Sequence, residues 1–186
     1  FGLTMAFEDF NPVKGFFGSP WVGFDNFIKF FTGPSFLTIL RNTLAISLLG
    51  LFIGFPLSIA FALLLNELNI LIFKKAVQTI SYMPYFVSMV VIAGLIIEFC
   101  ASNGVITNML VMLGMKRQNL LQNPAFFWGI NLVSDLWQGL GYGSIIFIAA
   151  ISNVSQELHE AATIDGAGRL KRIIHVTIPG IMPVIV

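Results

Sequence analysis

Residues 43–65 read TLAISLLGLFIGFPLSIAFALLL, a stretch without a charged side chain. A helix needs about 20 mostly apolar residues to cross a hydrocarbon core about 30 Å thick. Gly50, Gly54 and Pro56 lie inside the stretch, and spanning helices tolerate both residue types. The sequence therefore predicts a membrane-spanning helix over about residues 43–65.

Two further stretches predict spanning helices. Residues 77–99 are apolar except for a few side chains such as Glu98 near the far end, and they contain Pro84. Residues 125–151 are the most polar of the three stretches and hold four glycines. No internal repeat or long linker divides the chain, so we expect one domain over residues 1–186 that is an all-α, polytopic transmembrane helix bundle.

The two ends of the sequence read as parts of longer helices. The first residues, FGLTMAF, lack a start methionine and a basic region, so they do not read as a signal peptide. We interpret residues 1–7 as the tail of a helix and residues 180–186, GIMPVIV, as the start of another. The expectation is a fragment truncated at both ends.

Composition excludes several classes of function. Hydrophobic residues make up 56% of the chain and charged residues only 10%, and a net charge of +1 gives no basic surface for nucleic acid. The single Cys100 cannot form an intramolecular disulfide, and His159 and His175 have no partners at metal-ligand spacing. We expect no cofactor and no metal. An intramembrane enzyme would need a nucleophile with a base or a metal cluster, and neither pattern is present.

The most hydrophilic connection, residues 153–179, predicts two short helices. Ser155 is placed to cap the first helix, and Gly166 to end it. The second helix is expected over about residues 169–176, closed by Pro179. Two short helices at a tight angle would form a compact projection outside the membrane, which we call the knob. Such a shape suits a socket on a partner protein.

The knob carries a resemblance to a known family. The stretch EAATIDGAGRLKRIIHVTIP, residues 160–179, resembles the EAA loop of ABC importer permeases, with Val176 and Ile178 in place of the usual Ile and Leu. Residues 11–27 and 135–151 are similar to permeases that import oligosaccharides derived from polysaccharides. The resemblance therefore extends over essentially the whole chain.

The resemblance implies a fold, a location and partners. The fold is that of a type I ABC importer permease in the bacterial cytoplasmic membrane. The knob would be cytoplasmic and would dock into a separate ATPase subunit, since the chain has no GxxxxGK[ST] phosphate loop of its own. A second permease subunit in a heterodimer, an extracytoplasmic solute-binding protein and a carbohydrate substrate complete the expected assembly. The matching docking positions are Glu160, Ala161, Ala162, Asp165, Gly166 and Ala167.

Polar residues in the third predicted helix share one face. Asp135, Gln138, Gly139 and Tyr142 are spaced i, i+3, i+4 and i+7, and we call this set the stripe. Its donors and acceptors match sugar hydroxyls, and the corresponding helix of the resembling sugar permeases lines the transport path. A second interpretation remains open, in which the same groups bond to neighbouring helices.

Two alternatives to sugar import are less favoured. Glycerol phosphate or another small polar solute would use the same kind of permease. A secondary transporter or channel would also be a helix bundle, but it would lack an ATPase-docking loop and would more often show paired charges or inverted repeats.

Overall fold

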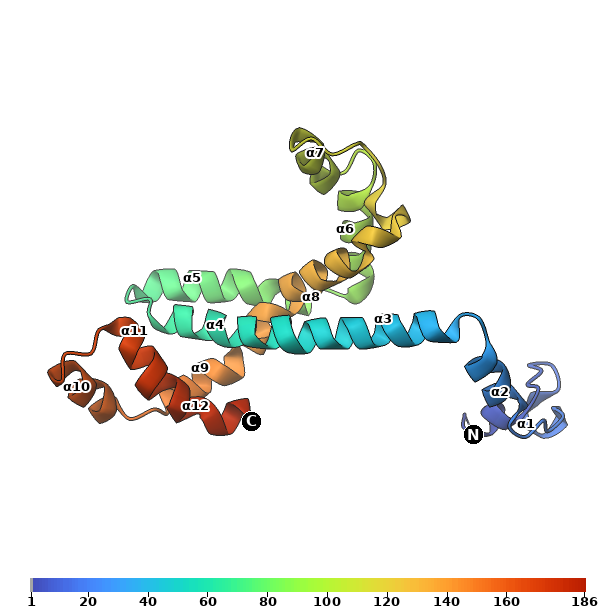
Figure 1. The fold of residues 1–186 in the computed structure, drawn as a ribbon, viewed down its shortest axis with the longest axis horizontal. Coiled ribbons are helices and arrows are strands. Elements are labelled where there is room, and N and C mark those ends of the chain that lie inside the picture. The colour runs from blue at the N-terminus through green and yellow to red at the C-terminus, as the bar shows by residue number, and fades with distance from the viewer. Residues whose placement is uncertain (1) are drawn as a thin grey trace. The chain divides into compact units, whose positions relative to one another are not determined.

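The computed structural model describes residues 2–186, and all their regular elements are helices or helical turns (Figure 1). One isolated antiparallel bridge joins Glu8 to Trp21. The chain divides into two compact units, one that ends at Ala45 and one from Ile46 to Val186. The predicted all-α class is confirmed.

The first unit is held together by aromatic packing and one amide. The ring of Trp21 stacks on that of Phe7 at 5.5 Å, and the Asn26 side chain donates hydrogen bonds to the carbonyls of Ala6 and Glu8 at 3.1 and 3.0 Å. Its elements are η1 (Thr4–Phe7), α1 (Gly15–Gly18), α2 (Asp25–Thr32) and the start of α3 (Phe36–Leu49). In place of the expected helix tail, η1 is a 3₁₀ turn, and residue 1 lies outside the described residues.

The second unit packs around a small core. Ala62, Phe147, Ile151 and Ile181 are buried together. They come from α4, α9 and α12, which bury their apolar faces against one another. The elements are η2 (Gly50–Gly54), α4 (Phe55–Asn66), α5 (Leu71–Tyr82), η3 (Met83–Phe86), α6 (Met89–Cys100), α7 (Val105–Met112), η4 (Leu120–Gln122), η5 (Pro124–Phe126), α8 (Phe127–Gly143), α9 (Ile145–Ser152), α10 (Gln156–Ile164), α11 (Arg169–Arg172), η6 (Ile173–Thr177) and α12 (Ile178–Ile185).

Three helical stretches within residues 2–186 are long and apolar enough to cross a membrane. They are Phe36–Asn66, Met89–Met112 and Pro124–Ser152. The first and third contain the predicted stretches 43–65 and 125–151. Where each helix enters and leaves the membrane stays a prediction.

The continuous helix predicted over residues 77–99 is wrong. After α5 the chain tightens into the 3₁₀ turn η3, which contains Pro84, and Val87 is extended. Proline lacks the N–H that a continuing helix needs, while Ser88 offers a cap: its Oγ accepts the Val91 N–H at 3.4 Å. A new helix, α6, therefore begins at Met89, and the second apolar stretch lies further along the chain.

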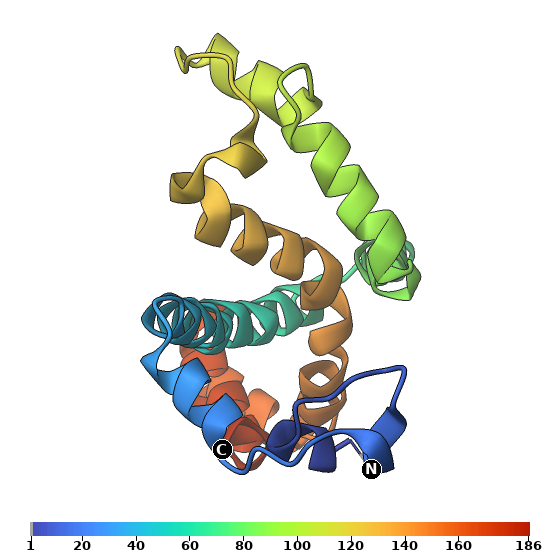
Figure 2. The same cartoon turned by 90° about the vertical axis from the view of Figure 1, so that its right-hand side faces the viewer.

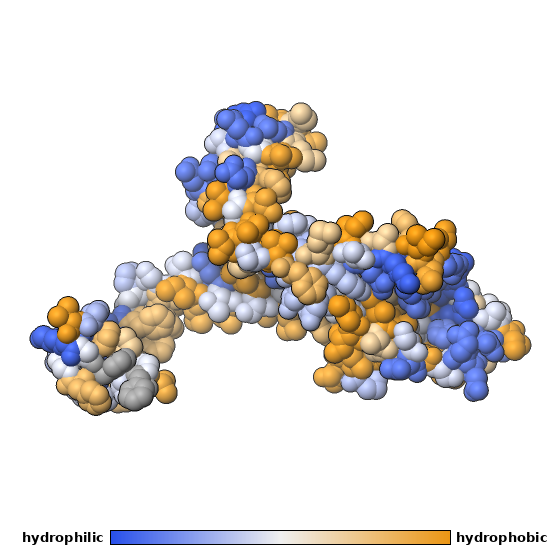
Figure 3. Space-filling view, turned by 180° about the vertical axis from the view of Figure 1, so that it is seen from behind, coloured by the Kyte–Doolittle hydropathy of each residue, from blue (hydrophilic) through white to orange (hydrophobic). Residues whose placement is uncertain are grey.

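Large apolar side chains lie on the outside of the second unit. Leu64, Ile72 and Val90 are 68, 83 and 82% exposed. A water-soluble domain of this size would bury many such side chains, whereas a lipid-facing surface leaves them outward. Figure 3 shows hydrophobic residues over much of this unit and hydrophilic residues gathered over the knob. The distribution fits a helix bundle in a bilayer with its knob in water.

The third stretch bends between α8 and α9, which meet at a visible angle in Figure 2. At the bend, the buried Ser144 donates from its Oγ to the carbonyl of Gly141 at 2.6 Å. Glycine and serine pairs are a known cause of helix kinks. Gly141 is also the point where α8 crosses α5, because a Cβ added there would collide with the carbonyl oxygen of Ser81. The bend directs α9 toward the knob.

Candidate functional site

The first helix of the knob, α10, begins at the predicted cap. The Oγ of Ser155 accepts the backbone N–H of Glu157 at 3.2 Å. Glu157 itself lies in the first turn, where a carboxylate interacts favourably with the positive end of the helix dipole. The local sequence thus fixes where α10 starts.

The end of α10 is closed by backbone hydrogen bonds around Gly166. The N–H of Ala167 donates to the carbonyl of Ala162 at 2.8 Å, and the N–H of Gly166 donates to that of Thr163 at 3.0 Å. This pair of bonds is a Schellman motif, which needs a residue with positive φ after the helix. Gly166 has φ of 76° and meets this need, and α10 ends at Ile164, two residues before it.

A hydrogen-bonded chain ties the two helices of the knob together. Arg172 donates from Nη1 to the hydroxyl of Thr163 at 3.1 Å, and that hydroxyl donates to the carbonyl of His159 at 2.7 Å. Thr163 and His159 belong to α10, whereas Arg172 ends α11. The contact links α10 to α11 across the turn between them.

The predicted end of the second helix at Pro179 is wrong. The chain stays helical to Ile185 through a π-turn, in which the N–H of Ile178 bonds to the carbonyl of Ile173, five residues back. Because the π-turn is one residue wider than an α-helical turn, it accommodates Pro179 without a break in the helix. Pro56 lies in the same arrangement, because it comes after the π-turn η2 at the same spacing as Pro179 after η6.

The six predicted docking residues lie together at the end of α10 and in its cap. Ala162 and Ala167 are half-buried and close the cap, while the other four are exposed. Glu160 and Asp165 therefore present their carboxylates to solvent, with the small Ala161 and Gly166 beside them. The surface combines negative charge with room for close approach by another protein. Its docking role stays a prediction.

The stripe lies along α8, but its members differ in exposure. Asp135 and Tyr142 are exposed, and Gln138 and Gly139 are half-buried. Within residues 2–186, neither the carboxylate of Asp135 nor the amide of Gln138 forms a hydrogen bond to a neighbouring helix. Both side chains are thus available to a ligand.

Sequence reasoning missed the aromatic partner of Tyr142. The ring of Tyr85 stacks on that of Tyr142 with 3.7 Å between centroids and 3° between planes, and the Phe86 ring meets Tyr142 edge-on. Tyr85 and Phe86 lie in η3, where the helix predicted over residues 77–99 breaks. The only signal in the sequence was Pro84, which marks that break.

Comparison with known proteins places the chain in a family. Residues 54–186 match the family model described as "Binding-protein-dependent transport system inner membrane component". The chain is 42% identical to the polygalacturonan/rhamnogalacturonan transport system permease protein YteP of Bacillus subtilis (strain 168), over all of this chain and 58% of that protein.

Two crystal structures have the same fold. One is of a bacterial ABC transporter involved in import of the acidic polysaccharide alginate, with a TM-score of 0.86, 40% identity, and coverage of 99% of this chain and 61% of the other. The second is a bacterial alginate ABC transporter in complex with an alginate pentasaccharide-bound periplasmic protein, with a TM-score of 0.82, 41% identity, and coverage of 88 and 57%.

The family match covers both the knob and the stripe, and the solved structures match the helical arrangement that carries them. The chain therefore belongs to the family of binding-protein-dependent transport system inner membrane components.

Proposed function

We propose that the full-length protein is the permease subunit of an ATP-driven importer of oligosaccharides. The observation that carries the proposal is the knob: a capped, internally bonded projection whose exposed end presents Glu160 and Asp165. An exposed projection with its own hydrogen bonds keeps its shape when it meets a partner. A chain without a phosphate-binding loop needs such a partner to obtain energy from ATP.

The knob is suited to transmit a motion. Closure of an ATPase dimer around ATP would displace a knob seated in each half, and α9 and α12 on either side of the knob would move with it. The helix bundle would thereby change from one access state to the other. Chemically, the permease supplies the path and the mechanical link, and hydrolysis of ATP belongs to the separate ATPase subunits.

The proposed assembly has four kinds of component. Two ATPase subunits would receive the knobs, a second permease subunit would complete the path as a heterodimer, and an extracytoplasmic binding protein would deliver the solute. The alginate transporter that this chain resembles was solved with a periplasmic protein carrying a pentasaccharide, which supports delivery of the same kind here.

The stripe supports a carbohydrate as the solute. Asp135 and Gln138 bring acceptors and donors without partners among the described residues, and sugar hydroxyls need both. The stacked rings of Tyr85 and Tyr142 leave each about half exposed, which provides flat apolar area next to those polar groups. The same lack of bonds to neighbouring helices disfavours the alternative in which the stripe only holds the bundle together.

Reconstitution tests the function as a whole. The full-length permease, purified with its partner subunits and placed in vesicles, should take up a pectin-derived or alginate-derived oligosaccharide only with ATP and the binding protein. Uptake driven by an ion gradient without ATP would instead identify a secondary transporter and contradict the proposal.

Substitutions in the stripe test the path. Gln138→Ala and Tyr142→Phe each remove one polar contact, so we expect about a tenfold weaker uptake with unchanged assembly and basal ATP hydrolysis. Val133→Ala, an exposed position on α8 outside the stripe, is the control and should transport normally. Normal uptake kinetics in both stripe variants for all oligosaccharides tried would remove the stripe from the path.

A further inference from the structure

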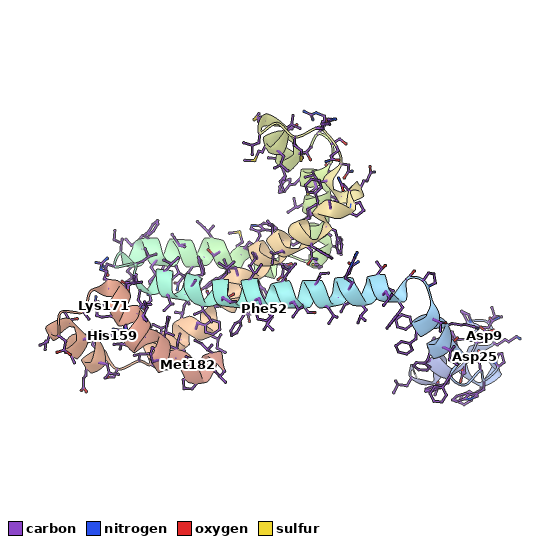
Figure 4. All side chains as sticks on the ribbon, viewed as in Figure 1. Asp9, Asp25, Phe52, His159, Lys171 and Met182 are labelled. Atoms are coloured by element: carbon purple, nitrogen blue, oxygen red, sulfur yellow. The ribbon has the colours of Figure 1, made fainter. Side chains whose placement is uncertain are left out.

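A polar cleft lies between the knob and the short connection that follows α4. Its volume is about 380 Å³, and its polar lining comes mainly from two sides of the fold. Asn66, Glu67 and Asn69 come from the end of α4 and the loop after it, and His159, Arg169 and Arg172 from the knob. Figure 4 labels His159 on α10 and Lys171 on α11, the two helices of the knob that flank it. The proposed ATPase contact uses neither arginine.

The charges of the cleft favour an anion. Arg169 and Arg172 are spaced i, i+3 and so share one face of their helix, and Glu67 is the single carboxylate in the lining. Counting the two arginines and Glu67, the lining carries a net charge of about +1. The amides of Asn66 and Asn69 add further hydrogen-bond donors.

Arg172 is only partly satisfied within the described residues. Its Nη1 bonds to Thr163, but its Nε is buried and has no hydrogen-bond partner there. A buried N–H without an acceptor is unfavourable, most of all on a charged group. An anion in the cleft would offer an acceptor to those guanidinium N–H groups at the end of the side chain that bond to no described residue.

The position of the cleft at the ends of two predicted spanning stretches indicates which kind of anion it meets. Asn66 and Ser152, which both line the cleft, are the last residues of two of the three stretches able to span a membrane. If these stretches span the membrane as predicted, the cleft lies where they leave the hydrocarbon core, at the level of phospholipid headgroups. Phosphate also has several oxygens in the geometry that an arginine fork recognises.

We propose that this cleft binds a phosphate group, and so links the knob to the loop after α4. The phosphate comes either from the headgroup of an anionic phospholipid or from free phosphate in the cytoplasm, and both sources present the same chemistry to the arginines. The proposal is independent of the proposed transport function, because it concerns a binding site that can be measured without ATP or solute.

The test uses the full-length permease, purified and stripped of lipid. Native mass spectrometry would measure binding of dioleoylphosphatidylglycerol and, separately, of dioleoylphosphatidylcholine, and thermal unfolding would be followed with and without inorganic phosphate. Arg169→Gln is the main variant, because Arg169 forms no side-chain hydrogen bond to other described residues. Arg172→Lys keeps the positive charge but removes the planar guanidinium, which can donate two parallel hydrogen bonds to a phosphate. Lys171→Gln removes a neighbouring charge that does not line the cleft and serves as the control.

We expect the unsubstituted permease to bind dioleoylphosphatidylglycerol about tenfold more tightly than dioleoylphosphatidylcholine. Arg169→Gln and Arg172→Lys should each lose most of that preference. Lys171→Gln should keep it. If the lipids bind equally, but inorganic phosphate stabilises the parent and not Arg169→Gln, the phosphate is the free ion. If both arginine variants match Lys171→Gln with every probe, the proposal is wrong. It is also wrong if an effect appears only when the ATPase is bound, since the arginines would then meet a protein group.

Discussion

The crossing of α5 with α8 and the cap of the knob each depend on one glycine, for opposite reasons. Gly141 is buried, and a side chain there would collide with the backbone of Ser81. Gly166 is exposed, and a Cβ added there would meet no atom within 4 Å. Its φ of 76°, however, is a conformation that residues with a Cβ adopt only with strain. The crossing is therefore fixed by a distant segment of the chain, whereas the cap is fixed by its own backbone.

This difference fits what each region is proposed to do. The crossing must hold two helices at one distance inside the helix bundle. The knob must keep its shape at the surface, where it has few neighbours, and hydrogen bonds within residues 162–167 give it that independence. Four substitutions test whether the two regions really depend on different kinds of constraint.

The largest effect is expected at the crossing. Gly141→Val places a branched side chain against the Ser81 backbone, which cannot move aside as a flexible side chain would. We expect a loss of about 3 kcal/mol in folding free energy, measured as a lower midpoint of thermal unfolding and a lower yield in the membrane. Gly129→Val is the matched control on the same helix, because its Cβ would meet no atom within 4 Å. Equal midpoints for the two variants would show that the crossing is not tight.

The next effect is expected at the cap. Gly166→Val forces a branched residue into positive φ, at a cost of about 2 kcal/mol that local unwinding would relieve. The permease should therefore stay folded but lose the ATPase during purification. In Gly168→Val the backbone has φ of −67°, which valine adopts freely. If as much ATPase co-purifies with Gly166→Val as with Gly168→Val, the cap is not required for docking.

A smaller effect is expected from the outer surface of the knob. Glu160→Ala removes an exposed carboxylate without changing the cap, and loss of a charged hydrogen bond to the partner is worth about 1.5 kcal/mol. We expect roughly a tenfold reduction in solute-stimulated ATP hydrolysis, with normal insertion in the membrane. Glu157→Ala, one turn earlier on α10, should have little effect. Full stimulation in Glu160→Ala would place the ATPase contact elsewhere.

The smallest effect concerns the start of α10. Ser155→Ala removes the cap on the Glu157 N–H, at a cost of about 1 kcal/mol. Since the knob is held by local bonds, the effect should stay within it. Hydrogen exchange should become faster at residues 156–159 and remain unchanged in α8. A spread of faster exchange to the crossing would contradict the independence of the two regions.

The sequence predicted the local features well because their causes are local. Ser155 and Gly166 each act on residues within a few positions, and residues 43–65 and 125–151 are long apolar runs, so their patterns can be read directly. The helix over residues 77–99 failed since apolar composition does not show how a cap at Ser88 competes with continuation after Pro84. The end at Pro179 failed because a π-turn has no clear sequence signal.

The remaining features depend on contacts between distant segments. Helical periodicity groups Gln138 with Tyr142 on one face, but it does not show that Tyr85 stacks on the latter or that Gly141 meets Ser81. These contacts follow from the angle at which η3 and α5 approach α8, which no single segment determines.

Site-specific photo-crosslinking tests most directly whether the knob is the ATPase contact. A photoreactive amino acid at the exposed Ala161, in the full-length permease purified with its partners, should form a covalent product with the ATPase subunit. The same group at Met112, which is exposed on α7, is the control and should not. A complex that retains its ATPase but yields no crosslink from Ala161 would contradict the coupling role of the knob.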